Sequence, residues 1–308
     1  MDPRKFQDPF VTAAGERRAQ VALKALETLW FNTGTLCNLT CGHCYIESSP
    51  KNDRLVYLTA AEVSEFLDEI VVSGLPTTLI GFTGGEPFMN PEFPAMLEDA
   101  LSRGFEALVL TNAMKPMAKC KPALLKLKDH YGDRLTIRVS IDHYGRAVHE
   151  DERGRRSWKP TIDGLCWLAR NGFVLHVASR RLSGETEAEI RAGFARLFDE
   201  LSIAIDAADP VRLMVFPEMD AAADVPEITE ACWGILGKSA DGVMCASARM
   251  VVKRNGAAHP AVLACTLLPY DERFELGPTL AAASGAVPLN HPHCAKFCVL
   301  GGGACSSN

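Results

Sequence analysis

Three cysteines in one short segment are the residues of this chain best suited to holding a metal cofactor. Cys37, Cys41 and Cys44 lie in the sequence CNLTCGHCY, with the spacing Cys-x3-Cys-x2-Cys. A four-iron cluster normally takes four thiolates, so three on one segment leave one iron open unless a distant residue supplies the fourth ligand. An open iron can bind a small molecule, which would make the cluster catalytic.

A zinc site is an alternative for the same segment. Zinc could use Cys41, Cys44 and two more distant ligands, because two residues between paired cysteines is a common zinc spacing. A disulfide scaffold fits less well, since the chain has 308 residues and begins with MDPRKFQDPF, which lacks a basic start followed by an apolar signal core. We therefore expect reduced thiols in a cytoplasmic protein.

The composition indicates a folded protein with a large core. Hydrophobic residues make up 47% of the chain and charged residues 23%. Apolar runs stay well below the roughly 20 residues of a membrane span, and the net charge of -6 gives no electrostatic reason to expect nucleic acid. The basic run RGRRSWK, at residues 153–159, is an exception that we interpret as a solvated loop and not as an RNA-binding surface.

Alternating strand and helix patterns predict the elements that would position the cysteines. Short apolar, β-branched segments predict strands at residues 29–35, 78–83, 106–111, 135–142, 173–179 and 211–216. Helical periodicity marks residues 59–72, 92–103, 119–130, 161–171 and 185–201, and a further helix over about 16–29 is expected to close one end of the fold. This alternation predicts an α/β fold with a parallel sheet, as a partial (β/α)6 TIM-type barrel.

The predicted barrel gives two loops a shared location. Cys37 follows the first predicted strand, and Gly84-Gly85-Glu86-Pro87 follows the second. Functional loops of such barrels lie at the carboxyl ends of the strands. Paired glycines allow close backbone approach to a ligand, Glu86 could bind a cationic amine, and Pro87 would make the loop rigid. A plain turn is the alternative for this segment taken alone.

The two loops, in this order and spacing, resemble the radical S-adenosylmethionine (radical SAM) enzymes over about residues 29–216. The resemblance implies a 4Fe-4S cluster on Cys37, Cys41 and Cys44, whose open iron binds the amino and carboxylate groups of S-adenosylmethionine. An electron from the cluster would cleave that cofactor to methionine and a 5′-deoxyadenosyl radical, which abstracts hydrogen from a substrate. An electron donor such as flavodoxin or ferredoxin is implied as a partner.

The resemblance also suggests which residues contact the cofactor. The candidates are His43, Tyr45, Gly84, Gly85, Glu86, Ser140, Asp142 and Arg181. Ser140 and Asp142 match a Ser-x-Asp pattern and share one strand face, with cofactor, substrate and structural roles open for Asp142. Arg180 or Arg181 could pair with the cofactor carboxylate through its planar donor fork, a surface arginine being the alternative. Thr111-Asn112 also resembles a recurrent family feature, although a turn-forming asparagine is the simpler interpretation.

Five more cysteines crowd a glycine-rich tail that follows a linker-like stretch at residues 221–226. They are Cys245, Cys265, Cys294, Cys298 and Cys305. Such crowding suggests metal in place of a large apolar core, with zinc and inert buried cysteines as alternatives. The tail resembles the SPASM and twitch extensions of the family, which implies one auxiliary 4Fe-4S cluster held by Cys245, Cys265 and two of the last three cysteines.

The sequence therefore predicts three parts of the chain: an N-terminal helical extension (1–28), a radical SAM core (29–216) and an auxiliary-cluster domain (217–308). Cys232 could join the auxiliary set, whereas Cys120 and Cys166 read as core residues. The chain is predicted to be a radical SAM oxidoreductase or maturase acting on a peptide or a small biosynthetic intermediate. No extra amino-terminal peptide-recognition domain is evident, which weakens the peptide reading. The alternative is a non-catalytic zinc- or iron-sulfur-binding structural or regulatory protein on a barrel scaffold.

Overall fold

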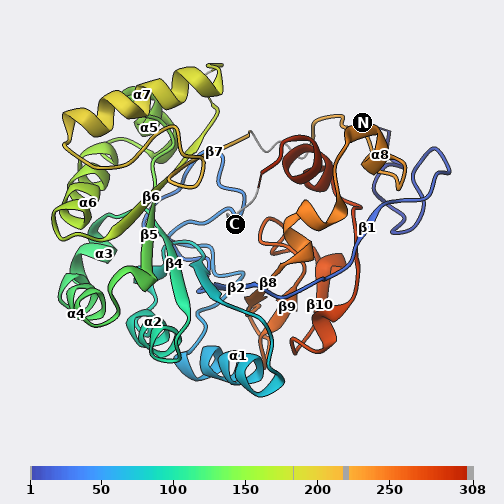
Figure 1. The fold of residues 1–308 in the computed structure, drawn as a ribbon, viewed down its shortest axis with the longest axis horizontal. Helices are drawn as coiled ribbons and strands as arrows, with labels where there is room; N and C mark the ends of the chain where they lie inside the picture. Colours follow the sequence, from blue (N-terminus) through green and yellow to red (C-terminus); the bar gives the residue numbers. More distant parts are fainter. Residues whose placement is uncertain (1, 183, 218–221, 304–308) are drawn as a thin grey trace.

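A nine-stranded sheet runs through the computed structural model, which describes residues 2–182, 184–217 and 222–303. Six neighbouring strands are parallel and follow chain order: β2 (Thr28–Asn32), β3 (Leu79–Thr83), β4 (Glu106–Thr111), β5 (Leu135–Ser140), β6 (Val174–Arg180) and β7 (Leu213–Phe216). Figure 1 shows helices on the outer side of these strands, whose inner side faces the centre of the molecule. The α/β partial barrel is therefore confirmed.

Five helices lie close to their predicted positions: α1 (Ala60–Ser73), α2 (Phe93–Ser102), α4 (Lys121–Tyr131), α6 (Trp158–Arg170) and α7 (Glu187–Glu200). The sequence did not predict the short helices α3 (Lys115–Lys119), α5 (Arg146–Arg153) and α8 (Cys232–Leu236). Helix α1 illustrates the sequence rules: Thr59 and Glu62 form a capping box at its start, and Gly74 closes it in the left-handed conformation with φ of 60°. Its buried face consists of Val63, Phe66, Leu67 and Ile70.

Two apolar cores lie on opposite sides of the barrel strands. On the outer side, the Phe82 ring lies 5.8 Å from that of Phe31 and 5.3 Å from that of Phe93 on α2. On the inner side, Trp30 is buried against Gly81, where an added Cβ would lie 2.3 Å from the indole ring. Glycine at position 81 therefore lets the indole fill the barrel interior.

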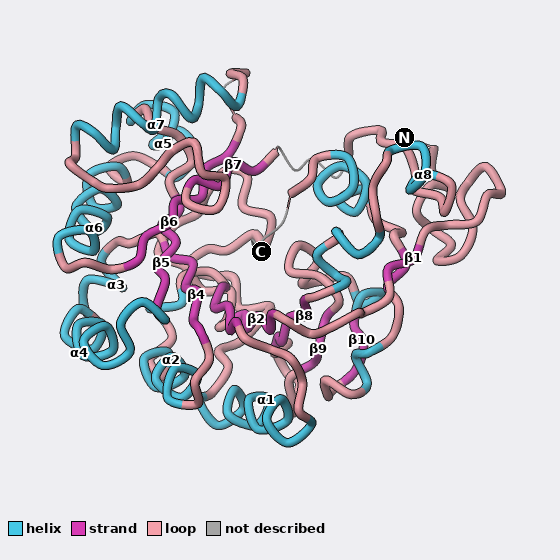
Figure 2. The backbone as a smooth tube through the Cα atoms, viewed as in Figure 1, coloured by secondary structure: helices cyan, strands magenta, loops and turns pink. Residues whose placement is uncertain are grey.

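The C-terminal region continues the barrel sheet. Strand β8 (Ala248–Val252) pairs in parallel with β2, and β9 (Ala261–Leu263) and β10 (Glu275–Gly277) follow in antiparallel order. Figure 2 shows β8, β9 and β10 beside β2 in one continuous row. Residues on both sides of position 217 thus share one sheet, which fixes the C-terminal region against the first barrel strand.

The helix expected over residues 16–29 is wrong. The segment is extended, and its strand β1 (Gln20–Val21) pairs with β11 (Val287–Pro288) of the C-terminal region. The buried Arg18 guanidinium donates to three backbone carbonyls and forms an ion pair with Glu227, with 2.5 Å between N and O. These tertiary contacts override the helix propensity of the Ala-, Leu- and Glu-rich sequence. The N-terminal segment therefore lies against the C-terminal region (Figure 1).

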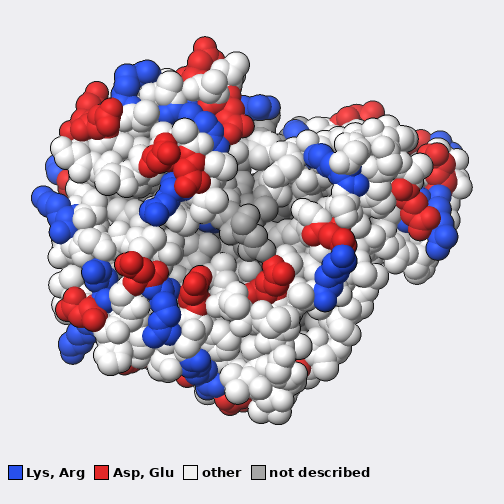
Figure 3. Space-filling model, viewed as in Figure 1, with Lys and Arg blue, Asp and Glu red and all other residues white. Residues whose placement is uncertain are grey.

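The surface carries charges of both signs. Acidic and basic side chains are interspersed over the face shown in Figure 3. The basic run at residues 153–159 is divided: Arg153 points inward to an ion pair with Asp142, while Lys159 pairs with Asp163 at 2.7 Å on the surface. Among the helices of the described residues, none has the length and apolar character needed to cross a membrane.

Candidate active site

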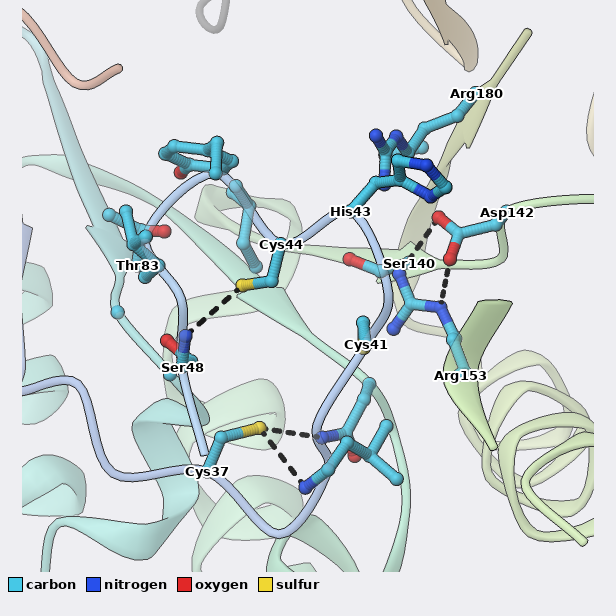
Figure 4. A pocket seen from close by; sticks show the side chains of 18 of the residues that line it. Cys37, Cys41, His43, Cys44, Ser48, Thr83, Ser140, Asp142, Arg153 and Arg180 are labelled. Carbon is cyan, nitrogen blue, oxygen red and sulfur yellow. Dashed lines mark hydrogen bonds and ion pairs between the residues drawn. The ribbon is translucent and has the colours of Figure 1, made fainter. Parts of the chain in front are cut away.

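One cavity at the carboxyl ends of the parallel strands contains most of the predicted site residues. It has a volume of about 1060 Å³, including its open mouth. The predicted residues that line it are Cys37, Cys41, His43, Cys44, Tyr45, Gly84, Gly85, Ser140 and Asp142. Figure 4 shows the three cysteines on one loop. Ser140, at the end of strand β5, and Asp142, just after it, lie on the side of the cavity formed by the strands. Glu86 and Arg181 are the two predicted contacts that do not line this cavity.

The end of helix α5 holds the cysteine loop in place. The Gly42 N–H donates to the backbone carbonyl of Glu152 at 2.8 Å, and the His43 N–H donates to the Glu152 carboxylate at 2.7 Å. The other carboxylate oxygen lies 2.6 Å from His43 Nδ1, and Arg180 donates to the carboxylate at 3.0 Å. Glu152 thus joins the cysteine loop, α5 and the end of β6. The sequence analysis did not identify Glu152, because neither its burial nor its pairing with His43 is visible in the local pattern.

Backbone N–H groups donate hydrogen bonds to two of the three cysteine sulfurs. Leu39 N–H donates to Cys37 Sγ, and Ser48 N–H donates to Cys44 Sγ, each at 3.4 Å. Burial raises the pKa of the Cys37 thiol to about 12 and that of the Cys41 thiol to about 11 in the metal-free chain. Metal binding must therefore displace protons from these thiols, as thiolate ligands require.

Three thiols on one wall of a cavity form a donor set that fits a 4Fe-4S cluster with one open iron. Within the described residues, no three His, Cys, Asp or Glu side chains converge closely enough to hold a single metal ion. Cluster ligands need not converge on one point, because each thiolate binds a different iron. The N–H donors at Cys37 and Cys44 are also of the kind that stabilises cluster thiolates.

Asp142 reaches the cavity as part of a buried ion pair. Arg153 donates to both of its carboxylate oxygens, at 2.7 and 3.0 Å, as Figure 4 shows. Burial alone would raise the pKa of Asp142, but the Arg153 charge and hydrogen bonds outweigh it and keep that pKa below the usual 3.8. The Arg153 charge also acts on Cys41 and Cys37. Arg153, which sequence reasoning missed, therefore supplies a positive charge beside the cysteine loop.

The paired glycines let two loops pack against each other. Gly84 has φ of 140°, and a Cβ there would lie 2.5 Å from the Gly34 carbonyl oxygen. A Cβ on Gly85 would lie 2.2 Å from the carbonyl oxygen of Leu36, directly before Cys37. The close approach that glycine permits is thus to the chain entering the cysteine loop, while Gly84 and Gly85 still line the cavity.

The Glu86 carboxylate points away from the cavity. It is buried and accepts hydrogen bonds from the Thr111 hydroxyl at 2.7 Å and from the Asn112 N–H at 2.8 Å. The Phe88 N–H, in the short helix η1 (Pro87–Met89), donates to it at 3.3 Å. The carboxylate therefore fastens the loop after β3 to the end of β4. These three bonds engage both carboxylate oxygens, and the amine contact expected for Glu86 stays a prediction.

Buried Glu86 gives the metal-free protein a testable pH dependence. Burial raises the pKa of Glu86 from 4.5 to about 7. Between these values the unfolded chain has lost the proton and the folded chain keeps it, so stability falls as pH rises, by up to about 3 kcal/mol, and then levels off. We expect Glu86→Gln to remove this pH-dependent part of the free energy of unfolding. Urea unfolding of both metal-free proteins at pH 5 and pH 8 checks it, and an equal stability difference at the two pH values would contradict it.

The two arginines after strand β6 point in different directions. Arg180 lines the cavity and pairs with Glu152, whereas the Arg181 side chain is exposed and its N–H donates to the Phe216 carbonyl at 3.0 Å. Alternation along the strand puts Ala178 and Arg180 on the inner face and turns the next residue away. Arg180, and not the predicted Arg181, therefore lines the cavity, while pairing of an arginine with the cofactor carboxylate stays a prediction.

The end of strand β7 and the C-terminal region together supply an apolar wall to the cavity. Phe216, Leu267 and Phe297 line it, and the rings of Phe216 and Phe297 lie 5.6 Å apart. The Tyr270 hydroxyl donates to the Ile46 carbonyl, just beyond Cys44, at 2.6 Å. The cavity is thus closed on one side by residues far away in the sequence, which no local pattern identified.

The later cysteines gather around the second apolar core. Cys245 and Cys294 are buried and close enough to interact electrostatically, and Cys265 and Cys298 pack against the same core. Cys294 and Cys298 both belong to the π-helix η7 (Cys294–Leu300). Cys305 lies outside the described residues. Cys232 Sγ accepts a hydrogen bond from the Thr229 N–H at 3.3 Å, while Cys120 and Cys166 pack against the barrel core.

A buried arginine fixes the chain around Cys245. The Arg249 guanidinium is almost fully buried and donates to four backbone carbonyls, those of Cys245, Ala248, Ala283 and Gly285. Burial raises the pKa of the Cys245 thiol to about 11, and the Arg249 charge offsets only part of that rise. A metal that binds Cys245 would therefore displace a proton, and the buried Arg249 charge would lie beside the thiolate that forms.

Comparison with known proteins agrees with this geometry. Residues 31–197, which include the cysteine loop and strands β3 to β6, match the family model of the Radical SAM superfamily. The chain belongs to this superfamily. Membership implies a 4Fe-4S cluster and S-adenosylmethionine, and the three thiols at the cavity fit the cluster.

Two curated relatives are named as a bacteriocin biosynthesis protein and as a maturase. The chain is 30% identical over 169 residues to the antilisterial bacteriocin subtilosin biosynthesis protein AlbA of Bacillus subtilis, covering 54% of this chain and 35% of AlbA. It is 22% identical over 138 residues to the mycofactocin maturase MftC of Mycolicibacterium smegmatis, covering 45% and 33%. The chain thus spans about a third of the length of these two relatives.

Solved structures share the fold. Streptococcus suis SuiB bound to S-adenosylmethionine superposes with a TM-score of 0.60 at 13% identity, over 82% of this chain and 63% of SuiB. The structure of anSMEcpe with bound AdoMet superposes with a TM-score of 0.59 at 15% identity, over 83% and 79%. At such identities the likeness establishes the fold alone.

Proposed function

We propose that the protein is a radical SAM maturase or oxidoreductase that cleaves S-adenosylmethionine reductively at a 4Fe-4S cluster on Cys37, Cys41 and Cys44. When bound, the cluster and S-adenosylmethionine supply an electron and a 5′-deoxyadenosyl radical that abstracts hydrogen from a substrate. The observation that carries this proposal is that the three cysteines and the loop of Gly84 and Gly85 line one cavity. A one-electron donor such as flavodoxin or ferredoxin completes the system.

The polar groups of the cavity suit the charged ends of S-adenosylmethionine. The cofactor carries an amine, a carboxylate and a sulfonium, so it needs donors and acceptors placed apart. Ser140 offers a hydroxyl, and Arg153 and Arg180, each paired with a carboxylate, add guanidinium donors to the lining of the cavity. These donors suit the carboxylate, whereas backbone groups of Gly84 and Gly85 suit the amine.

The apolar wall supports a role in handling a radical. Phe216, Leu267 and Phe297 present apolar side chains to that side of the cavity and reduce its contact with water. A reactive radical needs such exclusion, because side reactions compete with transfer to the substrate. The same wall would hold an apolar group of the substrate.

We propose a peptide as the substrate class. AlbA is named for biosynthesis of the bacteriocin subtilosin, MftC is named a maturase, and a further SuiB structure contains the precursor peptide SuiA. A small molecule is the second candidate, supported by a relative named S-adenosylmethionine-dependent nucleotide dehydratase, 33% identical over 76 residues. The two candidates are distinguished by incubating the reconstituted protein with precursor peptides and, separately, with small molecules, and measuring which class of compound is converted to product.

We further propose that residues 217–308 form a SPASM- or twitch-like region with one auxiliary 4Fe-4S cluster. Cys245, Cys265 and Cys294 would be ligands, together with Cys298 or Cys305. The proximity of Cys245 to Cys294 and the buried Arg249 guanidinium beside Cys245 support this assignment. Four protein ligands would leave no open iron there, so this cluster would transfer electrons or brace the substrate side of the cavity.

Anaerobic reconstitution tests both proposals. The protein should bind about eight irons and form 5′-deoxyadenosine from S-adenosylmethionine when a reductant is added. Cys265→Ala should lower the iron content by about four while cleavage of S-adenosylmethionine is kept. Zinc binding without iron would overturn the catalytic proposal, and loss of zinc alone from the Cys265 variant would overturn the auxiliary cluster.

A further inference from the structure

Asn112 is fixed in position at the end of strand β4. It is buried, and its backbone N–H donates to Glu86 at 2.8 Å while its carbonyl accepts from the Thr161 hydroxyl at 3.2 Å. Its side-chain oxygen Oδ1 accepts from the Met114 N–H at 3.0 Å. Three of its polar groups are therefore held by three different segments of the barrel.

These bonds determine which way the amide group faces. A backbone N–H can only donate, so the Asn112 atom facing Met114 must be the oxygen. The amide nitrogen Nδ2 then faces the cysteine loop, where it donates to Asn38 Oδ1 at 3.0 Å and lies 3.9 Å from Cys37 Sγ. The two dashed lines that reach the Cys37 sulfur in Figure 4 are this contact and the one from Leu39 N–H.

The turn after Asn112 is held in an unfavourable backbone conformation. Ala113 has φ of 57°, in the left-handed region that a residue with a Cβ rarely adopts. Helix α6 presses against this turn through Gly164, where an added Cβ would lie 1.9 Å from the Ala113 carbonyl oxygen. Strain of this kind persists where the surroundings fix it, and it often accompanies functional sites. The position of the Asn112 amide is thus fixed both by its own hydrogen bonds and by the packing of helix α6 against the residue that follows it.

We propose that Asn112 raises the reduction potential of the catalytic cluster by donating a side-chain hydrogen bond to the Cys37 sulfur. The inference rests on the proposed cluster at Cys37, Cys41 and Cys44. Reduction adds negative charge to a cluster and its thiolates, so a donor at the sulfur stabilises the reduced form more than the oxidised form. Asn112 acts through Cys37 and is a positioning residue.

A redox titration of the reconstituted protein tests the inference. Asn112→Ala removes the donor, and Asn112→Asp keeps the size and an acceptor for Met114 while replacing the donor with an anion. We expect the reduced-to-oxidised ratio of the S-adenosylmethionine-binding cluster at a fixed potential to fall about tenfold in Asn112→Ala, equivalent to about 59 mV for one electron. The aspartate should lower it further. The EPR signal of the reduced cluster is the readout.

A matched control separates this effect from simple loosening of the loop. The Asn52 amide donates to the carbonyls of Ile46 and Glu47 in the same loop and makes no contact with a cluster thiol. Asn52→Ala should leave the potential unchanged. A wild-type potential in both Asn112 variants, or an equal shift in Asn52→Ala, would overturn the inference. If the wild-type protein forms no such cluster, the proposed function fails as well, which the iron content reveals separately.

Discussion

Alanine at Cys41 is expected to reduce the formation of 5′-deoxyadenosine by roughly 1000-fold or more, a loss of about 4 kcal/mol in transition-state stabilisation. Cys41 lines the cavity between Cys37 and Cys44, and removing its thiol leaves two ligands on a loop that needs three. The variant should also lose the iron of this cluster. Iron content and product formation under anaerobic reduction measure both effects.

Cys120→Ala is the matched control for the Cys41 variant. Cys120 lies between helices α3 and α4, packs partly against the barrel core and does not line the cavity. This variant should keep its iron and its cleavage activity. The circular dichroism spectra of both variants should match that of the wild type, since Cys41 lies on an irregular loop. Full cleavage by the Cys41 variant would remove the proposed site.

The sequence predicted the barrel well because its signals are local. Each core strand is a short apolar run and each helix shows its own periodicity, so the six parallel strands lie within a few residues of their predicted positions. The predicted N-terminal helix was wrong because the structure of that segment is determined by contacts with distant residues. The burial of Arg18 and the pairing of β1 with β11 depend on residues more than 200 positions away, which no local pattern contains.

The candidate site divides in the same way. The cysteine loop and the glycine pair could be found because their spacing is short and their places after the first two strands follow from the barrel. Glu152 could not, because its partner His43 lies 109 residues away. The choice between Arg180 and Arg181 depended on strand register, which sequence pattern leaves open by one residue. The partners of Glu86 could not be predicted from the sequence, because they depend on how closely the ends of strands β3 and β4 approach each other.

Glu152→Ala is expected to destabilise the metal-free protein by about 3 to 5 kcal/mol, because removal of one partner leaves a buried charge without compensation. The Glu152 carboxylate is 5% exposed and is shared by His43 and Arg180, whose side chain is 12% exposed. The cysteine loop would also lose its bond from the His43 N–H. We therefore expect weaker cluster binding in addition to the loss of stability, measured by urea unfolding and by iron retention.

Glu150→Ala on the same helix is the matched control. Glu150, whose own side chain is 17% exposed, forms an i,i+4 pair with Arg146, whose side chain is 66% exposed, so loss of this solvent-screened pair should cost only about 0.3 to 0.5 kcal/mol. Glu152→Gln provides the finer test, because an amide can still accept from the His43 N–H while it lacks the charge that Arg180 requires. If Glu152→Gln binds iron like the wild type but unfolds more easily, the hydrogen bond positions the loop and the ion pair stabilises the barrel. Equal stability of the Glu150 and Glu152 alanine variants would contradict the expected cost of leaving Arg180 buried without its partner.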